Sequence, residues 1–169
     1  ILKLRKELDL FANIRPAKVY PALSNSSPLK KEILENVDFI IIRELTSGLY
    51  FGEPKKRWIE NDKRYAVDTL TYNEDEVRRV VKVGFEMAMK RNRKLHSLDK
   101  MNVMASSRLW REIADEVSKE YPEVELIHML ADNAAMQIIT NPSDFDVLVT
   151  ENTFGDILSD EAAVIGGSM

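Results

Sequence analysis

Two acidic residues near the end of the sequence are spaced so that they can act together. Asp156 and Asp160 lie four residues apart in a segment that follows a buried strand pattern and favours a helix with Asn152 as its cap. On such a helix both carboxylates share one face, where like charges repel by roughly a few tenths of a kcal/mol. This spacing suits a cation such as Mg²⁺ or Mn²⁺, which takes oxygen ligands. The alternative is a pair of solvated acids on an exposed helix face.

A third acid, Asp132, stands where a predicted strand over residues 124–130 meets a predicted helix over residues 133–140. Ligand sites in open α/β sheets form at the ends of strands, which favours a role in binding. Taken alone, an aspartate at this position is equally explained as a helix N-cap. Three acids at strand-to-helix transitions together are more indicative of a cation site than any one of them.

Three arginines form the complementary cationic set. Arg43 ends a run otherwise made of Phe and Ile, so its guanidinium needs an anionic partner, and its planar fork matches a carboxylate. Arg5 and Arg15 are open to a second interpretation, as ordinary surface charges. Three arginines beside a metal would suit a small di- or tricarboxylate.

Two further residues have side chains that can move protons. Tyr50 lies between Gly48 and Gly52 on a loop just past Arg43, where it could reach a cleft as a general acid; otherwise its ring packs against the neighbouring segment. Lys100 follows a predicted strand, where neighbouring groups could shift its pKa and make it a base. The alternative for this lysine is an exposed pair with Asp99.

The elements that must position these residues read as an alternation of helices and strands. A β-branched run over residues 37–44 is typical of a central strand buried on both faces, and the strand over 11–20 contains Pro16, which an edge strand or bulge tolerates. Further strands are predicted over 94–98, 124–130 and 145–149, and helices after a capping box at 73–76, from 107, over 133–140 and after 152. This order indicates an α/β layered domain with helices covering a partly parallel sheet.

The segment over residues 46–72 has no helical or regular strand period. Its aromatic residues are spread too loosely for a core helix, which predicts an extended hairpin or arm over about 54–72. An arm rich in aromatics packs on a partner subunit, and the alternative is a twisted surface hairpin.

Composition excludes several classes of function. The chain has 169 residues, 44% of them hydrophobic, which suits one domain with a core, and its net charge of -4 gives no support to nucleic-acid binding. It has no cysteine, and its apolar runs are too short to cross a membrane. No signal-peptide pattern occurs at the start, so a cytoplasmic location is the default. Because the sequence begins at Ile1 and stops in mid-pattern, we expect a fragment.

Known nucleotide-binding motifs are missing from the sequence. No Gly-x-Gly-x-x-Gly or phosphate-loop pattern occurs, and the two histidines, His96 and His128, lie on predicted strands without the spacing of metal ligands. A Rossmann fold therefore has no support.

These residues together resemble the metal-dependent β-decarboxylating dehydrogenases of 2-hydroxy acids, a family that includes 3-isopropylmalate, isocitrate, homoisocitrate and tartrate dehydrogenases. The resemblance covers essentially the whole chain, through LRKELDLFANIRPAKVYP, IIIRELTSGLYFGEP, SLDKMNV, LADNAAMQII and NTFGDILSDEAAVIGGSM. The segments RELTSGLYFGEP and LDKMNV look like the isopropylmalate branch, although Ser47 replaces a glycine common at that place. The resemblance implies an isopropylmalate-dehydrogenase-like layered sheet with covering helices and a protruding β-arm. Residues 1–169 would form the central segment, mainly the second domain with short flanks of the first.

The resemblance also implies a role for each candidate residue. Arg5, Arg15 and Arg43 would hold the substrate carboxylates, and Asp132, Asp156 and Asp160 would ligate Mg²⁺ or Mn²⁺, with Asp132 also contacting substrate. Lys100 would remove the hydroxyl proton as hydride passes to NAD, and Tyr50 would protonate the enolate carbon after loss of CO₂.

In such enzymes two subunits share each active site, so the resemblance implies a homodimer. Lys100 and Asp132 would come from the neighbouring subunit, and the arm with the helices near 73–90 and 107–121 would supply the interface. Ile1, Leu2 and the partner's Val103 would contact the isopropyl group, and Asn102 would approach the nicotinamide. The adenine site would lie mostly outside this chain, so we expect little or no turnover from it alone.

Two other readings remain open at this stage. A homoisocitrate or tartrate dehydrogenase would use the same chemistry on a different side group. A dimerisation module without catalysis would keep the fold and lose the reaction.

Overall fold

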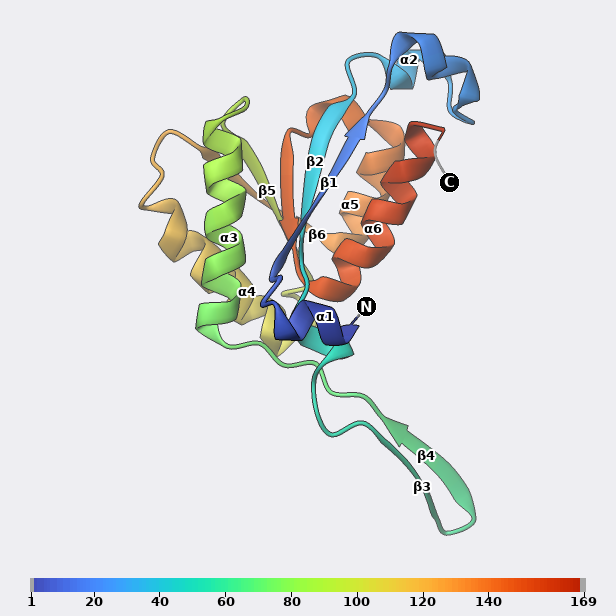
Figure 1. Cartoon of the computed structure of the whole chain (residues 1–169), viewed down its shortest axis with the longest axis vertical. Coiled ribbons are helices and arrows are strands. Elements are labelled where there is room, and N and C mark those ends of the chain that lie inside the picture. The colour runs from blue at the N-terminus through green and yellow to red at the C-terminus, as the bar shows by residue number, and fades with distance from the viewer. Residues whose placement is uncertain (1, 168–169) are drawn as a thin grey trace.

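The computed structural model describes residues 2–167, without the side chains of residues 2, 3 and 6. A five-stranded sheet carries helices on both faces, and a separate two-stranded hairpin protrudes from one end (Figure 1). In chain order the elements are α1 (Leu2–Glu7), β1 (Ala12–Lys18), η1 (Pro21–Ser26), α2 (Lys31–Leu34), β2 (Asp38–Glu44), η2 (Gly48–Tyr50), β3 (Lys56–Glu60), β4 (Lys63–Val67), α3 (Glu74–Met89), β5 (Lys94–Asp99), α4 (Ala105–Ser118), β6 (Glu125–Leu130), α5 (Ala131–Thr140), η3 (Pro142–Asp144), β7 (Val147–Thr150) and α6 (Asn152–Ile165).

The sheet has the strand order β1-β2-β7-β5-β6. Strands β2, β7, β5 and β6 are parallel, and only β1 runs antiparallel to its neighbour β2. The carboxyl ends of the four parallel strands therefore meet at one edge of the sheet, which is where ligands bind in open α/β folds. The expected layered and partly parallel α/β architecture, distinct from a Rossmann fold, is confirmed.

Two hydrophobic cores lie on opposite faces of the sheet. Helices α3 and α4 cover one face with Val80, Phe85 and Trp110, and α5 and α6 cover the other with Ile138 and Leu158. Successive residues of a strand point to opposite faces, so the β-branched run of β2 divides between both cores. The predicted burial of this strand on both faces is confirmed, although β7 occupies the middle of the sheet.

Strand β1 lies at one edge of the sheet, as the proline in it predicts. Pro16 is opposite Ile40 in the β1–β2 register. Proline has no N–H to donate, so it is tolerated only where a strand has a free side or a bulge.

Helix starts agree with the sequence at α3 and differ elsewhere. Asn73 caps α3 in a full capping box with Glu76, as the sequence predicts. Helix α4 begins at Ala105 and α5 at Ala131, two residues earlier than expected in each case. Glu151, and not Asn152, caps α6, because its carboxylate accepts the backbone N–H of Phe154 at 2.7 Å.

The predicted arm is the hairpin of β3 and β4. Its residues are exposed, and Trp58 stacks on Tyr65 with ring centroids 5.2 Å apart, so the ring pair is the hairpin's own packing. Ile59 is 74% exposed on this hairpin. Within residues 2–167, no helix has the length and apolar character that crossing a membrane requires.

Candidate functional site

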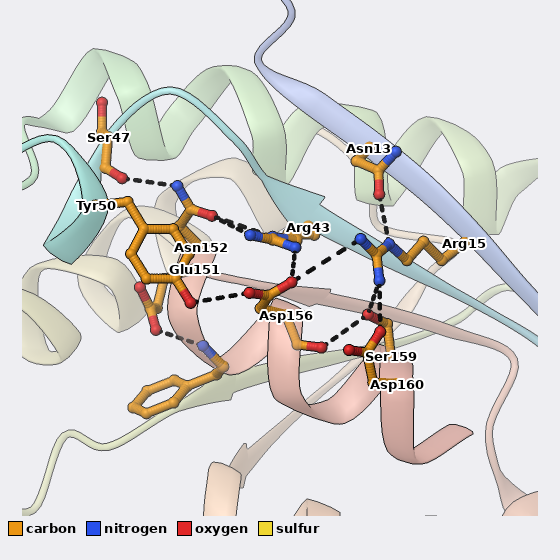
Figure 2. A network of polar contacts seen from close by, with 11 residues as sticks. Asn13, Arg15, Arg43, Ser47, Tyr50, Glu151, Asn152, Asp156, Ser159 and Asp160 are labelled. Atoms are coloured by element: carbon orange, nitrogen blue, oxygen red, sulfur yellow. Dashed lines mark hydrogen bonds and ion pairs between the residues drawn. The ribbon is translucent and has the colours of Figure 1, made fainter. Parts of the chain in front are cut away.

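Arg43 faces helix α6 because of the alternation along β2. Phe39 and Ile41 point into the core beneath α5 and α6, and Arg43 is two residues further along the same face. Its guanidinium is 2% exposed and forms an ion pair with Asp156 (Figure 2). A buried guanidinium needs such a partner, because burying an unpaired charge is costly.

Asn152 holds the remaining side of this guanidinium. Its Oδ1 accepts hydrogen bonds from Arg43 Nε at 3.1 Å and Nη2 at 2.9 Å, and its Nδ2 donates to the Ser47 carbonyl at 2.9 Å. Asn152 is fully buried at the first turn of α6. It therefore fixes both Arg43 and the loop that leads to Tyr50.

Tyr50 points toward the same carboxylate. Its hydroxyl donates to Asp156 Oδ2 at 2.9 Å, and its ring lies 5.8 Å from the Arg43 guanidinium carbon (Figure 2). The hydroxyl therefore lies in the site, where the predicted general acid would have to be.

Arg15 joins the group from strand β1. Its Nη1 donates to Ser159 Oγ at 2.6 Å and to Asp160 Oδ1 at 3.0 Å, and its Nη2 lies 3.9 Å from Asp156 Oδ1. Its Nε donates to Asn13 Oδ1 at 2.7 Å. Asp156 and Asp160 are thus paired with arginine guanidinium groups, and Arg15 is more than a surface charge.

Charge and burial shift the pKa of two groups in this cluster. Burial lowers the pKa of Arg43; Asp156 opposes that effect, and the positive charges of Arg15 and Arg5 lower it further. Arg5 and Arg15 are therefore both close enough to Arg43 for their charges to act on it. Burial and the hydrogen bond to Asp156 raise the pKa of Tyr50, which keeps its hydroxyl proton in place.

A second polar group lies at the same edge of the sheet. Lys100 follows β5, and its amine is 2.6 Å from Asp132 Oδ1 at the start of α5. This hydrogen bond lowers the pKa of Asp132. The alternative pairing of Lys100 with Asp99 is wrong, because Asp99 is held by Arg111 at 2.8 Å and 3.0 Å. The N-cap alternative for Asp132 also fails, since Leu130 occupies that position.

The two groups remain separate within one chain. Within residues 2–167, no hydrogen bond or ion pair joins them, although β7, which leads to α6, lies beside β5, which leads to Lys100. Among residues 2–167, no three acidic, histidine or cysteine side chains gather closely enough to hold a metal ion. The chain thus brings Asp156 and Asp160 together but does not add Asp132 to them.

The remaining predicted residues contribute less. Asn102 and Val103 are exposed on the turn after β5. Ile1 lies outside the described residues, and the side chain of Leu2 is not described.

Sequence reasoning missed four residues of the site, although their spacing carried a signal. Asn152 and Ser159 follow a helical period with the predicted Asp156, so all three share one face of α6. Asn13 is two residues from Arg15 on β1 and shares its face. Glu151 was missed as the cap because Asn is the more familiar capping residue.

The chemistry of the larger group is that of an anion site beside an oxygen-rich helix face. Arginine guanidinium groups bind carboxylates in a bidentate manner, and aspartate oxygens suit a hard divalent cation. A protonated phenol adjoins both. Such a set could hold a small anionic substrate and exchange a proton with it.

Comparisons with known proteins agree with this geometry. A family model described as "Isocitrate/isopropylmalate dehydrogenase" matches residues 1–169. The chain is 59% identical to "3-isopropylmalate dehydrogenase" of Bacillus subtilis (strain 168), covering 100% of this chain and 47% of that protein. It is 58% identical to the protein of the same name of Aquifex aeolicus (strain VF5), covering 100% and 46%. The chain thus spans about half the length of these relatives.

Among solved structures, the chain superimposes on isocitrate dehydrogenase from Methylococcus capsulatus with a TM-score of 0.88 and 32% identity, covering 99% of this chain and 48% of that one. The family model, the relatives and the fold all agree along the whole chain. This chain therefore belongs to the isocitrate/isopropylmalate dehydrogenase family.

Proposed function

We propose that this chain is the central part of a 3-isopropylmalate dehydrogenase. The enzyme would convert 3-isopropylmalate to 2-oxoisocaproate by NAD-dependent oxidative decarboxylation, in leucine biosynthesis in the cytoplasm. The proposal is supported by relatives of that name at 59% and 58% identity. The observation that carries it is the group formed by Arg15, Arg43, Tyr50, Asp156 and Asp160, drawn from four elements.

The arginines are the proposed carboxylate-binding groups. Arg43 is held in place by Asn152, so its guanidinium is oriented before any substrate arrives. Arg15 and Arg5 add positive charge around it. A substrate carboxylate would replace part of the ion pairing that Asp156 now provides to Arg43.

The acidic residues fit a hard divalent cation, although one chain supplies only part of the ligand set. Asp156 and Asp160 share a face of α6 and present oxygen atoms, and Asp132 of a second chain would complete the set. When bound there, Mg²⁺ or Mn²⁺ would polarise the substrate's hydroxyl oxygen as a Lewis acid.

Two residues of the chain would move protons. Lys100 would remove the proton of the substrate hydroxyl as hydride leaves for NAD, with Asn102 near the nicotinamide. The paired carboxylate of Asp132 holds the amine in one position. After CO₂ leaves, Tyr50 would donate its proton to the enolate carbon, and its raised pKa keeps that proton available.

A homodimer would bring the two groups into one site. The exposed large hydrophobic residues of the helices are mainly Met136 on α5 and Ile157 and Val164 on α6, and Ile59 is exposed on the arm. We therefore place the interface on the arm and on α5 and α6, rather than on α3 and α4 as the resemblance implies. This placement also puts Asp132, at the start of α5, at the boundary between subunits.

Steady-state kinetics of the longer enzyme test the function. We expect a strong preference for 3-isopropylmalate over isocitrate, homoisocitrate and tartrate, and little or no turnover from the 169-residue chain alone. Lys100→Ala and Tyr50→Phe should each lower kcat by about 10² to 10⁴. Lys82→Ala is the control, because this lysine makes only an exposed pair with Glu120.

Three outcomes would contradict the proposal. A preference for an acid without an apolar side group would favour homoisocitrate or tartrate as substrate. Full activity of Lys100→Ala would refute the mechanism. A longer protein that dimerises but oxidises none of these acids would favour the dimerisation module.

A further inference from the structure

A buried group of polar side chains lies beside the site and takes no part in the proposed reaction. Glu44 is 0% and Glu151 5% exposed, and the hydroxyl of Tyr72 lies between them. Tyr72 Oη is 3.2 Å from Glu44 Oε2 and 3.3 Å from Glu151 Oε2. It also accepts the backbone N–H of Asn152 at 3.0 Å.

If Glu44 and Glu151 were both ionised, the single hydroxyl hydrogen of Tyr72 could not form a hydrogen bond to both carboxylates. A phenol oxygen has one hydrogen to donate and two lone pairs to accept with. Tyr72 therefore cannot donate to both Glu44 and Glu151. With both ionised, one carboxylate oxygen would face a lone pair of the phenol in the interior, which is a costly arrangement.

The other contacts of the two glutamates distinguish them. Glu44 Oε1 accepts from Thr46 N at 2.7 Å and Thr46 Oγ1 at 2.8 Å, and its Oε2 accepts from Ser47 N at 3.1 Å. These are three donors aimed at a carboxylate. Within residues 2–167, the hydrogen-bond partner of Glu151 Oε2 is Tyr72 alone, while Oε1 accepts from Phe154 N.

We propose that Glu151 is a neutral carboxylic acid in the folded protein, with its proton on Oε2. Glu151 then donates to Tyr72 Oη, and Tyr72 donates to Glu44 Oε2. The second lone pair of Tyr72 accepts from Asn152 N. Every donor and acceptor of the group is satisfied in this arrangement, and only Glu44 carries a charge.

The surroundings of Glu151 favour its neutral form. Burial is the largest effect and raises the pKa of Glu151. The N–H groups of Thr153 and Phe154 and the hydroxyl of Tyr72 lower this pKa, and the charge of Glu44 raises it. Tyr50 from η2 is a further titratable neighbour. Helix α4 presents only Ser106, Ser107 and Trp110, across a cavity with room for about one water molecule.

The hydrogen-bond chain would position Arg43 without touching the substrate. Glu44 directly follows Arg43 on β2, and Glu151 directly precedes Asn152, which binds the Arg43 guanidinium. The chain thus fixes the first turn of α6 against the end of β2. Glu151, Tyr72 and Glu44 are positioning residues in this account.

Infrared spectroscopy of the folded chain detects a protonated carboxyl group directly. At pH 7 we expect a carbonyl band of a neutral acid in the wild type that is absent from Glu151→Gln. Glutamine reproduces the proposed pattern, since its Nε2 donates to Tyr72 and its Oε1 accepts from Phe154. Glu151→Gln should therefore fold and keep the Arg43 Nε–H signal in NMR spectra.

Glu44→Gln is the matched variant. The introduced amide N–H groups would face the hydrogens of Ser47 N and Tyr72 Oη, so donors would meet donors. We therefore expect lower stability and a displaced Arg43 signal.

The pH dependence of unfolding gives a second measurement. A glutamate that is protonated when folded and ionised when unfolded makes stability fall as the pH rises from its ordinary pKa of 4.5 toward the higher folded pKa. In that range the unfolding constant of the wild type should rise about tenfold more per pH unit than that of Glu151→Gln. Equal slopes contradict the proposal.

Three spectroscopic outcomes would overturn the assignment. These are no neutral-acid band in the wild type at pH 7, a band that survives in Glu151→Gln, and a Glu151→Gln chain that does not fold. Loss of the band in Glu44→Gln alone would place the proton on Glu44 instead. No substrate or metal is present in these measurements, so their failure is distinct from failure of the proposed reaction.

Discussion

At the scale of single residues, Gly155 shows how closely α6 is fitted to Arg43. A Cβ at this position would lie 2.6 Å from Arg43 Cγ and 2.8 Å from its Cβ. These are the stem atoms of a buried side chain with hydrogen bonds at its far end, so the stem has little freedom to move. The glycine thus lets the first turn of α6 approach β2 and bring Asp156 to the guanidinium.

We expect Gly155→Ala to destabilise the chain by about 1 to 3 kcal/mol, because the methyl group must displace Arg43 or α6. Gly166→Ala is the control, since a Cβ there would meet its nearest neighbour, the Lys18 carbonyl, at an ordinary 3.5 Å. Urea denaturation of both variants measures the difference. Equal stability of the two would show that the close approach is unimportant.

The burial of His96 predicts that the folded chain loses stability at acidic pH. It is 3% exposed, and its Nδ1 has no hydrogen-bond partner among the described residues. Burial, followed by the charge of Lys94, lowers its pKa from 6.5 to about 4, while Asp144 and Asp146 oppose this effect. The unfolded chain therefore binds the proton first as the pH falls.

The stability contributed by neutral His96 should accordingly be complete above pH 6.5 and decline by about 3 kcal/mol as the pH falls to about 4. His96→Leu should remove this part of the acid dependence, because leucine does not titrate. Denaturant unfolding between pH 4 and pH 7 compares the two chains. A wild-type loss that persists unchanged in His96→Leu would assign it to other groups.

At the scale of elements, the arm is built differently from the rest of the chain. Strands β3 and β4 contribute nothing to either core, and their residues are exposed apart from the intermediate Val67. The segments that enter and leave the arm lie close together at its base, as shown by Gly52, where an added Cβ would collide with the Thr69 carbonyl. Within residues 2–167, the arm therefore adds no side chain to the cores of the body.

Replacing residues 55–68 by a short Gly-Ser linker should change the free energy of unfolding by less than about 1 kcal/mol, because little apolar area is lost. Dimerisation should weaken strongly, as measured by sedimentation equilibrium. Ile157→Glu on α6 and Ile59→Glu on the arm test each half of the proposed interface. A dimer unaffected by all three changes would refute the interface.

At the scale of the whole molecule, the sheet arranges the site as two groups along one edge. The Arg43 and Asp156 group lies at the ends of β2 and β7, and the Lys100 and Asp132 pair lies at the ends of β5 and β6. Parallel strands place both groups at this common edge, where no hydrogen bond or ion pair joins them within residues 2–167. A second copy of the chain is the proposed means of joining them.

Metal binding should therefore depend on chain concentration. We expect the affinity for Mn²⁺, measured by electron paramagnetic resonance, to rise as the chain dimerises. Asp132→Asn and Asp160→Asn should each abolish tight binding. An equal mixture of the two should recover about a quarter of the wild-type sites, because half of the dimers are mixed and each has one intact site. No recovery in the mixture would contradict sharing between subunits.

The sequence alone determined the layered α/β class, the buried strand over 37–44, the capping box at Asn73 and the edge position of the strand with Pro16. Each of these depends on local periodicity or on the chemistry of one residue. The resemblance added the roles of the candidate residues, which the residues themselves left open.

Only the tertiary structure decided which side chains meet. It paired Lys100 with Asp132 instead of Asp99, made Glu151 the cap of α6, and revealed the group around Tyr72. These contacts join residues 28 to 80 positions apart, or depend on where a helix begins, and no local period encodes either. Hydrogen-bond satisfaction in the interior selects among such partners, and that selection requires the packed sheet and helices to be in place.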